Sequence, residues 1–594
     1  GGGEGAGFGD KMKSAELLMN FLRHDTEKIP LYGFVLQKER FVPKENTAPL
    51  ERSTPEAEGV PSGAIERFYK TIEAQADTTA CHAITILRHG KVIAEGAYAP
   101  YRLEVPHMLY SMSKSVTGLA VGIACDEGYL DINERLVEIF PEYVTNSNAK
   151  ILKAHTLRHL LTMSSGIRFN EVGSGLDENW MKMFMQSVPK FEAGTEFDYN
   201  SLNSYVLAAA VVKRTGMSLV DFLTPRLFEP LGIRYHEWEK CPMGIEKGGW
   251  GLSLTAEDAA KLGQLCMNMG RWNGKQIVSE EWIRQATSVQ IKTPNGEMKH
   301  GYGYQIWMSD DDGDYQFNGA FGQYVLVFPK YETVIAMYSG SSNLFVNGGL
   351  SGMVRELLTS FADEPLAADN EAYASLKSTL NSLEYSPSHP RYLGTDAEEF
   401  ERIAYRLDGR EYFAGPNTGG LFPQTLQAVH SNMTDSVTML RFEKRDKDLY
   451  LYIYEKDERN LLVLRHDGAF EYGAATMRGE RQLVATRCRW KLDVNRIRLW
   501  VMTGFIETPN SRILTLDIAP QKMSVTFDER PALDKTVQML FDLVGVSSMA
   551  FYRHMLPLLQ RENLVNLVKR FTEPVAECVM VKHNDEEPLP RIEK

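Results

Sequence analysis

The spacing of apolar and polar residues predicts helices and strands between residues 53 and 340. A helix start is indicated by Ser53-Thr54-Pro55-Glu56, because a capping residue and a proline precede apolar residues at helical spacing. Alternating residues on both sides of His89-Gly90 predict a β-hairpin over 83–87 and 92–97. The pattern is mostly helical over 126–260, and further strands are expected at 303–308, 315–318, 324–328 and 334–338. Strands at both ends of this segment imply one sheet completed by distant parts of the chain, an α+β arrangement.

The pattern changes after about residue 365. Residues 369–383 look helical, and Ser386-Pro387-Ser388-His389-Pro390 is typical of a linker. Short strands then alternate with turns at a spacing that predicts a small barrel or sandwich. We expect these strands at 436–444, 448–455, 460–464, 483–492, 496–505, 513–518 and 523–527. Apolar residues return to helical spacing over 533–571, with Pro557 as an interruption.

A chain of 594 residues is too long for one hydrophobic core, so several domains are expected. We divide it into an N-terminal extension, an α+β domain, a helical linker, a β-barrel-like domain and a helical tail. Their predicted bounds are 1–52, 53–365, 366–403, 404–530 and 531–594.

Charge and composition exclude several classes of function. The net charge of −13 argues against nucleic acid as a partner, and the longest apolar runs are too short to span a membrane. The six cysteines are scattered without a C-x-x-C pair, so we expect no disulfide framework, no metal and no cofactor. Reduced thiols favour a cytoplasmic location. Because residue 1 is not Met, the sequence leaves open a signal removed before it.

The most informative candidate for chemistry is Ser111-Met112-Ser113-Lys114, an S-x-x-K string that runs into a dense apolar segment. That segment predicts a buried helix, on which a Ser and a Lys three residues apart share one face. A serine hydroxyl needs a base to remove its proton, and a lysine among apolar neighbours can lose its charge and serve as that base. The string also occurs at Ser147–Lys150 and Ser187–Lys190, in polar or proline-containing stretches that we interpret as surface loops.

Five ordered segments resemble the penicillin-recognising serine hydrolases, the family of class C β-lactamases, D-aminopeptidases, carboxylesterases and 6-aminohexanoate-oligomer hydrolases. They lie within residues 53–350 and are Leu109-Tyr110-Ser111-Met112-Ser113-Lys114-Ser115, His159-Leu160-Leu161-Thr162-Met163-Ser164-Ser165-Gly166, Gly194-Thr195-Glu196-Phe197-Asp198-Tyr199-Asn200-Ser201, Gly248-Gly249-Trp250-Gly251-Leu252 with Thr255-Ala256-Glu257-Asp258, and Asn318-Gly319-Ala320-Phe321-Gly322-Gln323. The resemblance implies an antiparallel sheet flanked by helices, with a helical subdomain. Relatives of this length often carry a lipocalin-like barrel after it, and residues 404–530 are compatible with one.

The resemblance also implies a role for each motif. Ser111 would be acylated by the substrate carbonyl, with Lys114 and the phenol of Tyr199 sharing the proton transfers. Lys114 would supply the positive charge that a phenol needs to act as a base. The backbone amides of Ser111 and Ala320 would form the oxyanion hole, and Gly319 would keep the strand open to substrate. Asn318 and Ser201 would contact the substrate.

Two departures from the family pattern narrow the expected substrates. The second motif is Tyr199-Asn200-Ser201 instead of Tyr-x-Asn, and the third has Phe317-Asn318-Gly319 where β-lactamases have Lys-Thr-Gly. That lysine binds the carboxylate of penicillins, so we expect little β-lactamase activity. The form of the motifs is nearest to the oligomer-hydrolase and family VIII-type carboxylesterase branch. Small amides, peptides or esters are therefore the expected substrates.

Three questions stay open from the sequence alone. The same residues would serve an acyltransferase, and a non-catalytic binding or scaffold protein could keep the fold. The role of the C-terminal domains and the formation of a homo-oligomer are likewise open.

We interpret His107, His155 and His159, which lie near the motifs, as structural residues, since Lys114 and Tyr199 already fill the acid–base role.

Overall fold

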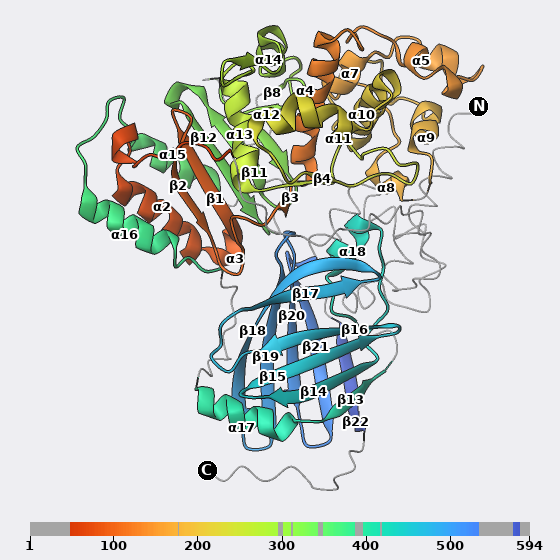
Figure 1. Cartoon of the computed structure of the whole chain (residues 1–594). Coiled ribbons are helices and arrows are strands. Elements are labelled where there is room, and N and C mark those ends of the chain that lie inside the picture. Colours follow the sequence, from red (N-terminus) through yellow and green to blue (C-terminus); the bar gives the residue numbers. More distant parts are fainter. Residues whose placement is uncertain are drawn as a thin grey trace. The chain divides into compact units, whose positions relative to one another are not determined.

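The computed structural model describes residues 48–175, 177–294, 301–309, 313–341, 349–385, 396–415, 419–533 and 574–581. These residues form two compact units, which divide between residues 385 and 396. We call residues 48–385 the first unit and the rest the barrel unit (Figure 1). Within the described residues, no helix has both the length and the apolar character needed to cross a membrane.

A seven-stranded antiparallel sheet forms the centre of the first unit, in the order β2-β1-β12-β11-β10-β9-β8. The strands are β1 (Cys81–Arg88), β2 (Lys91–Ala97), β8 (Gly301–Tyr302), β9 (Trp307–Met308), β10 (Tyr315–Gly319), β11 (Gln323–Phe328) and β12 (Thr333–Ser339). The early strand β1 pairs with the late strand β12, with Ile86 opposite Ile335. This pairing joins distant parts of the chain, so the predicted α+β arrangement is confirmed. The strand expected at 303–308 is shorter than predicted, since only 307–308 are extended.

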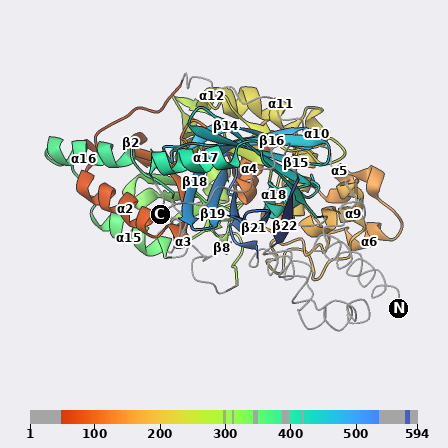
Figure 2. The same cartoon turned by 90° about the horizontal axis from the view of Figure 1, so that it is seen from below.

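Helices cover both faces of this sheet. Every residue of β1 is therefore buried. On one side, α2 (Ser62–Ala74) packs with α15 (Leu350–Thr359) and α16 (Asn370–Leu380), as Figures 1 and 2 both show. The Tyr69 hydroxyl of α2 donates to the carbonyl of Ile84 in β1 at 2.9 Å. Helix α13 (Ala256–Met267) packs against β1, β11 and β12. Since α16 packs against α2, the range predicted as a linker begins with a helix of the first unit.

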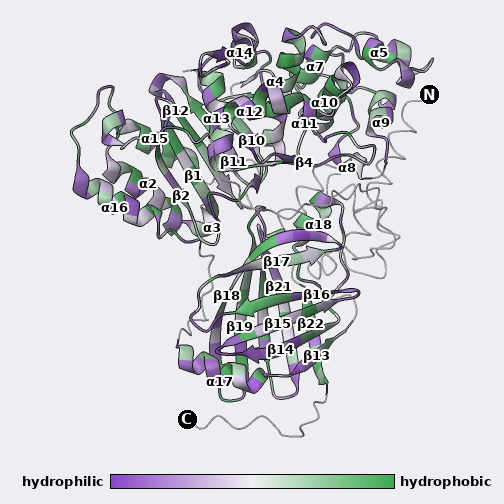
Figure 3. Cartoon of the chain, viewed as in Figure 1, coloured by the Kyte–Doolittle hydropathy of each residue, from purple (hydrophilic) through white to green (hydrophobic). Residues whose placement is uncertain are grey.

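A helical part lies between β2 and β8. Its central helices are α4 (Ser113–Asp126) and α10 (Ser201–Thr215), which pack against each other and carry long apolar stretches (Figure 3). The other helices of this part are α5 (Leu136–Ile139), α6 (Asn148–Ile151), α7 (Leu157–Leu161), α8 (Glu171–Ser174), α9 (Trp180–Gln186), α11 (Leu219–Leu223), α12 (Glu229–Leu231) and α14 (Glu280–Ala286), whereas the short helix α3 (Ala76–Thr79) precedes β1. A small sheet of β3 (His107–Met108), β5 (Leu252–Leu254) and β4 (Glu237–Trp238) joins the entry of α4 to residues 248–254.

The barrel unit is one ten-stranded antiparallel sheet in the order β16-β15-β14-β13-β22-β21-β20-β19-β18-β17. Its strands are β13 (Glu411–Ala414), β14 (Met439–Arg445), β15 (Asp448–Glu455), β16 (Glu458–Leu464), β17 (Glu471–Met477), β18 (Glu480–Asp493), β19 (Arg496–Phe505), β20 (Ser511–Ile518), β21 (Lys522–Arg530) and β22 (Val575–Val581). The outermost strands β16 and β17 contact each other, so the sheet is a nearly closed barrel. The predicted all-β C-terminal domain is confirmed.

Side chains fill the inside of the barrel. Buried and less buried residues alternate along β15, and Leu451, Leu499 and Leu516 belong to one buried apolar cluster. Helix α17 (Ala397–Leu407) adds Phe400, whose ring lies 4.8 Å from that of Trp490. The second helix of the unit is α18 (Gln424–His430). Because these inward residues are almost completely buried, the described part of the lumen is a packed core.

The sequence analysis missed three strands of the barrel, β13, β17 and β22. The position of β22 differs most from expectation, because its residues fall inside the range 531–594 that we predicted to be a helical tail. It pairs with β13 on one side and β21 on the other, so it is an interior strand of the sheet. The predicted helical segment at 533–571 lies almost wholly outside the described residues, as do most of the N-terminal extension and the linker sequence 386–390.

Candidate active site

The S-x-x-K string lies at the junction of a tight turn and a buried helix. Tyr110, Ser111 and Met112 form a 3₁₀ turn, and α4 begins at Ser113, so Ser111 precedes the helix that we expected it to open. Tyr110 has φ of 50°, a conformation that is uncommon for residues other than glycine. Backbone strain of this kind is held only where the surroundings fix it, and it is found at functional sites. Ser111 itself is half-buried.

Lys114 is buried in the first turn of α4, with 2% of its surface exposed. Its Nζ donates to Ser111 Oγ at 2.8 Å and to the carbonyl of Gly249 at 2.9 Å. Among the described residues it has no ion-pair partner within 4 Å. Burial lowers the pKa of Lys114 to about 7, and the carboxylate of Glu171 acts in the opposite direction. A sizeable fraction of this amine is therefore neutral near pH 7.

The Gly249 carbonyl is held in place by close packing. A side chain at Gly249 would collide with the carbonyl of Ser201, so only glycine fits there. Next to it, the Gly248 carbonyl accepts a hydrogen bond from Thr117 Oγ1 at 2.7 Å, and Ser113 Oγ accepts one from the Leu252 amide at 3.1 Å. These contacts attach the glycine-rich segment to α4 and aim a carbonyl at Lys114.

The structure brings Tyr199 to the same place from a distant part of the chain. Lys114 Nζ lies 4.7 Å from the centroid of the Tyr199 ring, a cation–π distance when the amine is charged. Burial raises the pKa of Tyr199, a hydrogen bond with Ser111 lowers it, and the charge of Glu171 raises it again. Burial dominates, so the phenol keeps its proton at neutral pH.

The end of β10 passes close to the turn that carries Ser111. A side chain at Gly319 would collide with the carbonyl of Leu109, two residues before Ser111. Ala320 follows in the turn to β11, and its carbonyl accepts a hydrogen bond from Gln323 Nε2 at 3.2 Å. Asn318 is half-buried, and its Oδ1 is a buried acceptor that receives no hydrogen bond from a described residue. The third motif thus lies beside the candidate nucleophile.

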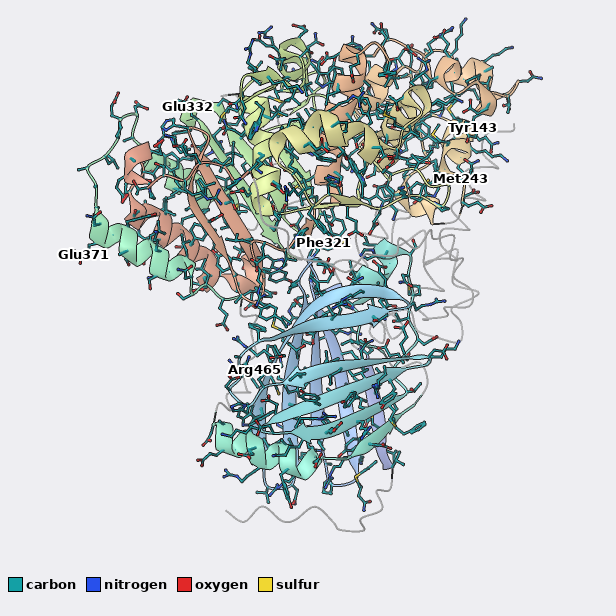
Figure 4. All side chains as sticks on the ribbon, in the orientation of Figure 1. Tyr143, Met243, Phe321, Glu332, Glu371 and Arg465 are labelled. Carbon is teal, nitrogen blue, oxygen red and sulfur yellow. The ribbon has the colours of Figure 1, made fainter. Side chains whose placement is uncertain are left out.

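A second residue with positive φ is found at this turn. Phe321 has φ of 67°, and its ring packs edge-on against Tyr110 at 5.3 Å between centroids (Phe321 is labelled in Figure 4). Tyr110 directly precedes Ser111 in the chain, and Phe321 directly follows Ala320. Each therefore helps to fix the backbone of the other.

The sequence analysis missed Glu171, which is the charged side chain that both Lys114 and Tyr199 sense. Ser201 Oγ donates to Glu171 Oε1 at 2.7 Å. Asn200 Nδ2 donates to the carbonyls of Ile167 and Phe169 at 3.0 and 2.8 Å and so anchors the segment before Glu171. No motif surrounds Glu171 in the sequence, and its position depends on hydrogen bonds that only the fold creates.

The sequence analysis also missed Trp307, whose ring stacks on that of Tyr199 at 5.4 Å and 28°. Trp307 is 8% exposed and belongs with Met163 and Tyr302 to a small buried cluster, against which Tyr199 and Phe197 pack. This cluster is the wall that holds the phenol in place. Trp307 was predicted only as part of a strand.

The alternative S-x-x-K strings and the three histidines have structural surroundings. Ser147 is exposed before α6, and Lys190 forms an exposed ion pair with Asp198 at 3.0 Å. The histidines form hydrogen bonds with the scaffold: His107 with the Met108 carbonyl, His155 with the Ser165 carbonyl, and His159 with the Thr156 amide.

Comparison with known proteins gives a family for this site. Residues 69–347 match the protein-family model described as "Beta-lactamase". A 6-aminohexanoate-dimer hydrolase of Paenarthrobacter ureafaciens is 26% identical over 318 residues, which cover 48% of this chain and 79% of that protein. An ML-236A carboxylate methylbutanoyltransferase of Penicillium citrinum is 24% identical over 161 residues, covering 23% of this chain and 38% of that protein.

Among solved structures, one described as "EstCE1, a hydrolase with promiscuous acyltransferase activity" is similar, with a TM-score of 0.42 and 17% identity. The similarity covers 50% of this chain and 99% of that one. By its match to the family model over residues 69–347, the first unit has the β-lactamase and penicillin-binding-protein-like fold. The resemblance seen in the sequence motifs is confirmed at this level.

Proposed function

We propose that the first unit is a serine hydrolase that cleaves small amides, peptides or esters through an acyl-enzyme on Ser111. The observation that carries the proposal is the 2.8 Å contact between Ser111 Oγ and the buried Nζ of Lys114, whose pKa is lowered to about 7. A half-buried hydroxyl next to an amine that is partly neutral near pH 7 can act as an activated nucleophile. The similarity to a 6-aminohexanoate-dimer hydrolase supports an amide or ester as the substrate.

In the proposed acylation, neutral Lys114 takes the proton of Ser111 while Oγ bonds to the substrate carbonyl carbon. The negative charge on the carbonyl oxygen is stabilised by the amides of Ser111 and Ala320. The bond to the leaving group then breaks, and the Tyr199 phenol gives that group a proton. The Lys114 ammonium returns its proton to Tyr199. In deacylation a water molecule replaces the leaving group, its proton is taken by the same pair, and Ser111 regains a proton as the acid product leaves.

This division of work differs from the one expected from the sequence. We expected the charge of Lys114 to make Tyr199 a base. Burial lowers the pKa of Lys114 and raises that of Tyr199, so the amine is suited to accept a proton and the phenol to donate one. We therefore assign Lys114 as the base and Tyr199 as the acid of the acylation step. Asn318, Gly319 and Ser201 stay in the proposal as residues that contact the substrate.

The test is reaction with a fluorophosphonate, followed by intact-mass and peptide analysis. We expect one adduct, on Ser111, and loss of p-nitrophenyl ester cleavage by roughly a thousandfold or more in Ser111→Ala. Ser147→Ala and Ser187→Ala are the matched controls and should keep full activity. An adduct on either control serine, or an unmodified and inactive protein, would overturn the proposal.

Hydrolysis of β-lactams should be weak. Phe317, which stands where β-lactamases have a lysine, is 2% exposed and belongs to the apolar core, so it offers the substrate carboxylate no charge. A charge-assisted hydrogen bond is worth roughly 1.5–3 kcal/mol, or about ten- to a hundredfold in binding. Nitrocefin turnover as fast as that of the best ester would contradict this part of the proposal.

Acyl transfer is the second candidate function, because a relative named as a methylbutanoyltransferase matches part of the chain. The same acyl-enzyme would pass its acyl group to an alcohol or amine instead of water. Product analysis with and without added acceptors separates the two reactions. We further propose a cytoplasmic location and leave open a homo-oligomer. Of the predicted domain bounds we keep 53–365 as a proposal for the hydrolase domain, whereas α16 packs with the first unit, and α17 and β22 belong to the barrel. A non-catalytic scaffold is not favoured, because Ser111, Lys114 and Tyr199 come together in one site.

A further inference from the structure

The active site contains a carboxylate that the acyl-enzyme chemistry does not use. Glu171 is half-buried at the start of α8, and one of its oxygens, Oε1, accepts the hydrogen bond of Ser201. The structure shows no hydrogen bond to Oε2, the other oxygen, from a described residue. A half-buried carboxylate with an oxygen that no described residue occupies can meet a ligand.

The position of Glu171 relative to the reacting groups follows from a short series of contacts. Ser201, its hydrogen-bond donor, follows Tyr199 by two residues in the second motif. The carbonyl of Ser201 packs against Gly249, whose own carbonyl accepts from Lys114. The charge of Glu171 is felt by both Lys114 and Tyr199. The carboxylate therefore lies within electrostatic range of any substrate bound at Ser111.

We propose that Glu171 is the specificity-determining residue of this site and that it selects substrates whose acyl or leaving group carries a positive charge. This inference rests on the proposed hydrolase function and names its substrate class. A cation beside Glu171 gains an attractive interaction, whereas a substrate carboxylate meets repulsion there. The third motif adds no compensating cation, since Phe317 is directed into the apolar core.

Ser201 and Asn200 are positioning residues in this scheme. The hydroxyl of Ser201 occupies Oε1 and so fixes the carboxylate, and Asn200 holds the preceding loop through its two carbonyl contacts. Glu171 is thus held on α8 by the same three-residue motif that supplies Tyr199. Glu171, which would recognise the charge, is therefore connected to Tyr199, the proposed acid, through the consecutive residues Tyr199-Asn200-Ser201.

The test uses a matched pair of p-nitrophenyl esters. One ends its acyl chain in a trimethylammonium group, and the other carries a tert-butyl group of the same shape in its place. A second pair places the same two groups on the leaving alcohol of an acetate ester. The readout is the ratio of kcat/KM for the charged and neutral member of each pair. Such a ratio cancels any change in the Ser111–Lys114 machinery, since both esters use it.

We expect wild type to favour the charged member of at least one pair, and Glu171→Gln to lower that ratio by roughly tenfold, as for loss of one charged contact. Glu171→Asp should keep part of the preference. The control is Glu196→Gln, which removes the same charge from an exposed position on the approach to the second motif and should leave the ratio unchanged. Equal ratios in wild type and Glu171→Gln would overturn the proposal.

A binding measurement makes the result independent of turnover. Calorimetry on Ser111→Ala with the trimethylammonium ester and its tert-butyl counterpart should show tighter binding of the charged ester, and the difference should disappear with Glu171→Gln. Absence of ester cleavage in wild type, together with an intact charge preference in binding, would refute the hydrolase function alone. Cleavage without any charge preference would refute the role of Glu171 alone.

Discussion

Both units of this protein bury cations, and Arg512 of the barrel unit and Lys114 of the first unit are held in opposite ways. In the barrel, Arg512 is 1% exposed, and its Nη1 lies 3.3 Å from an oxygen of Glu529, which is also 1% exposed. The two residues face each other across β20 and β21. In the first unit, Lys114 is 2% exposed and has only neutral acceptors among the described residues, Ser111 Oγ and the Gly249 carbonyl.

The difference separates a structural charge from a chemical one. A guanidinium keeps its proton in proteins, so a buried arginine needs a partner, and the barrel supplies Glu529 together with the Gly420 carbonyl at 2.9 Å. An amine can shed its proton when it is buried without a counter-ion, and it then becomes a base. A carboxylate partner thus indicates a buried cation that holds the fold, and the lack of one among the described residues indicates a group suited to react.

The largest effect on activity is expected when Lys114 or its partner Tyr199 is replaced. Lys114→Ala and Tyr199→Phe should each lower kcat/KM for an activated ester by about a thousandfold, within the range for acid–base residues. Because the two residues pass one proton between them, the double variant should be little worse than either single variant. A double-mutant cycle checks this, with folding monitored by circular dichroism. Losses that add in free energy would show that the residues act independently.

Breaking the paired cation should affect stability instead. Arg512→Met leaves Glu529 buried without its partner, so we expect the barrel to lose about 3–5 kcal/mol of stability. Arg512→Met combined with Glu529→Gln should recover part of this loss, because the charge is removed from both sides. Hydrogen-exchange mass spectrometry of β20 and β21 measures the effect locally. Turnover per fluorophosphonate-titrated site should stay at the wild-type value, and a fall there would show that the barrel pair contributes to the chemistry.

A smaller effect is expected from the residue that positions Tyr199. Trp307→Leu removes the stacked ring, and we expect kcat to fall roughly tenfold through misplacement of the phenol, with a smaller change in KM. Trp307→Phe keeps an aromatic ring and should recover most of the activity. If the phenylalanine and leucine variants are equally impaired, stacking on Tyr199 is not the role of Trp307.

The smallest effect concerns pH. Since we propose neutral Lys114 as the base, kcat/KM for a neutral ester should rise with pH and level off above an apparent pKa near 7. Glu171 favours the charged amine, so Glu171→Gln should move this rise to lower pH. Profiles of wild type and Glu171→Gln, taken in one buffer system at constant ionic strength, test both statements. A rate that falls as pH increases through 7 would exclude Lys114 as the base.

Most helices and strands that depend on a local sequence pattern could be predicted from the sequence. Strand β15, which alternates clearly, and β19, which is mostly apolar, have the predicted bounds, and the Ser111–Lys114 spacing correctly indicated a contact. Strand β13 has only four residues, and β22 is separated from its partner β21 by more than forty. Neither contains enough local signal to be recognised alone.

The sequence predicted those site residues that lie in recognisable motifs. Ser111, Lys114 and Tyr199 could be named because their residue types and spacing follow a pattern, and the structure brings them together. Glu171 and Trp307 could not, because a carboxylate on a four-residue helix and a tryptophan on a two-residue strand carry no pattern of their own. The pKa of Lys114 also depends on its burial. The sequence indicates that burial only through the apolar residues that follow Lys114.

The interior place of β22 has a consequence for synthesis on the ribosome. Every element of the first unit is complete by α16, so this unit can begin to fold while the rest of the chain is still being made. The barrel cannot join β13 to β21 until residues 575–581 have been translated, roughly 10–30 s after β13 and a few seconds after β21 at usual rates. During that interval both strands expose unpaired edges, where a nascent chain is open to wrong partners and to chaperones.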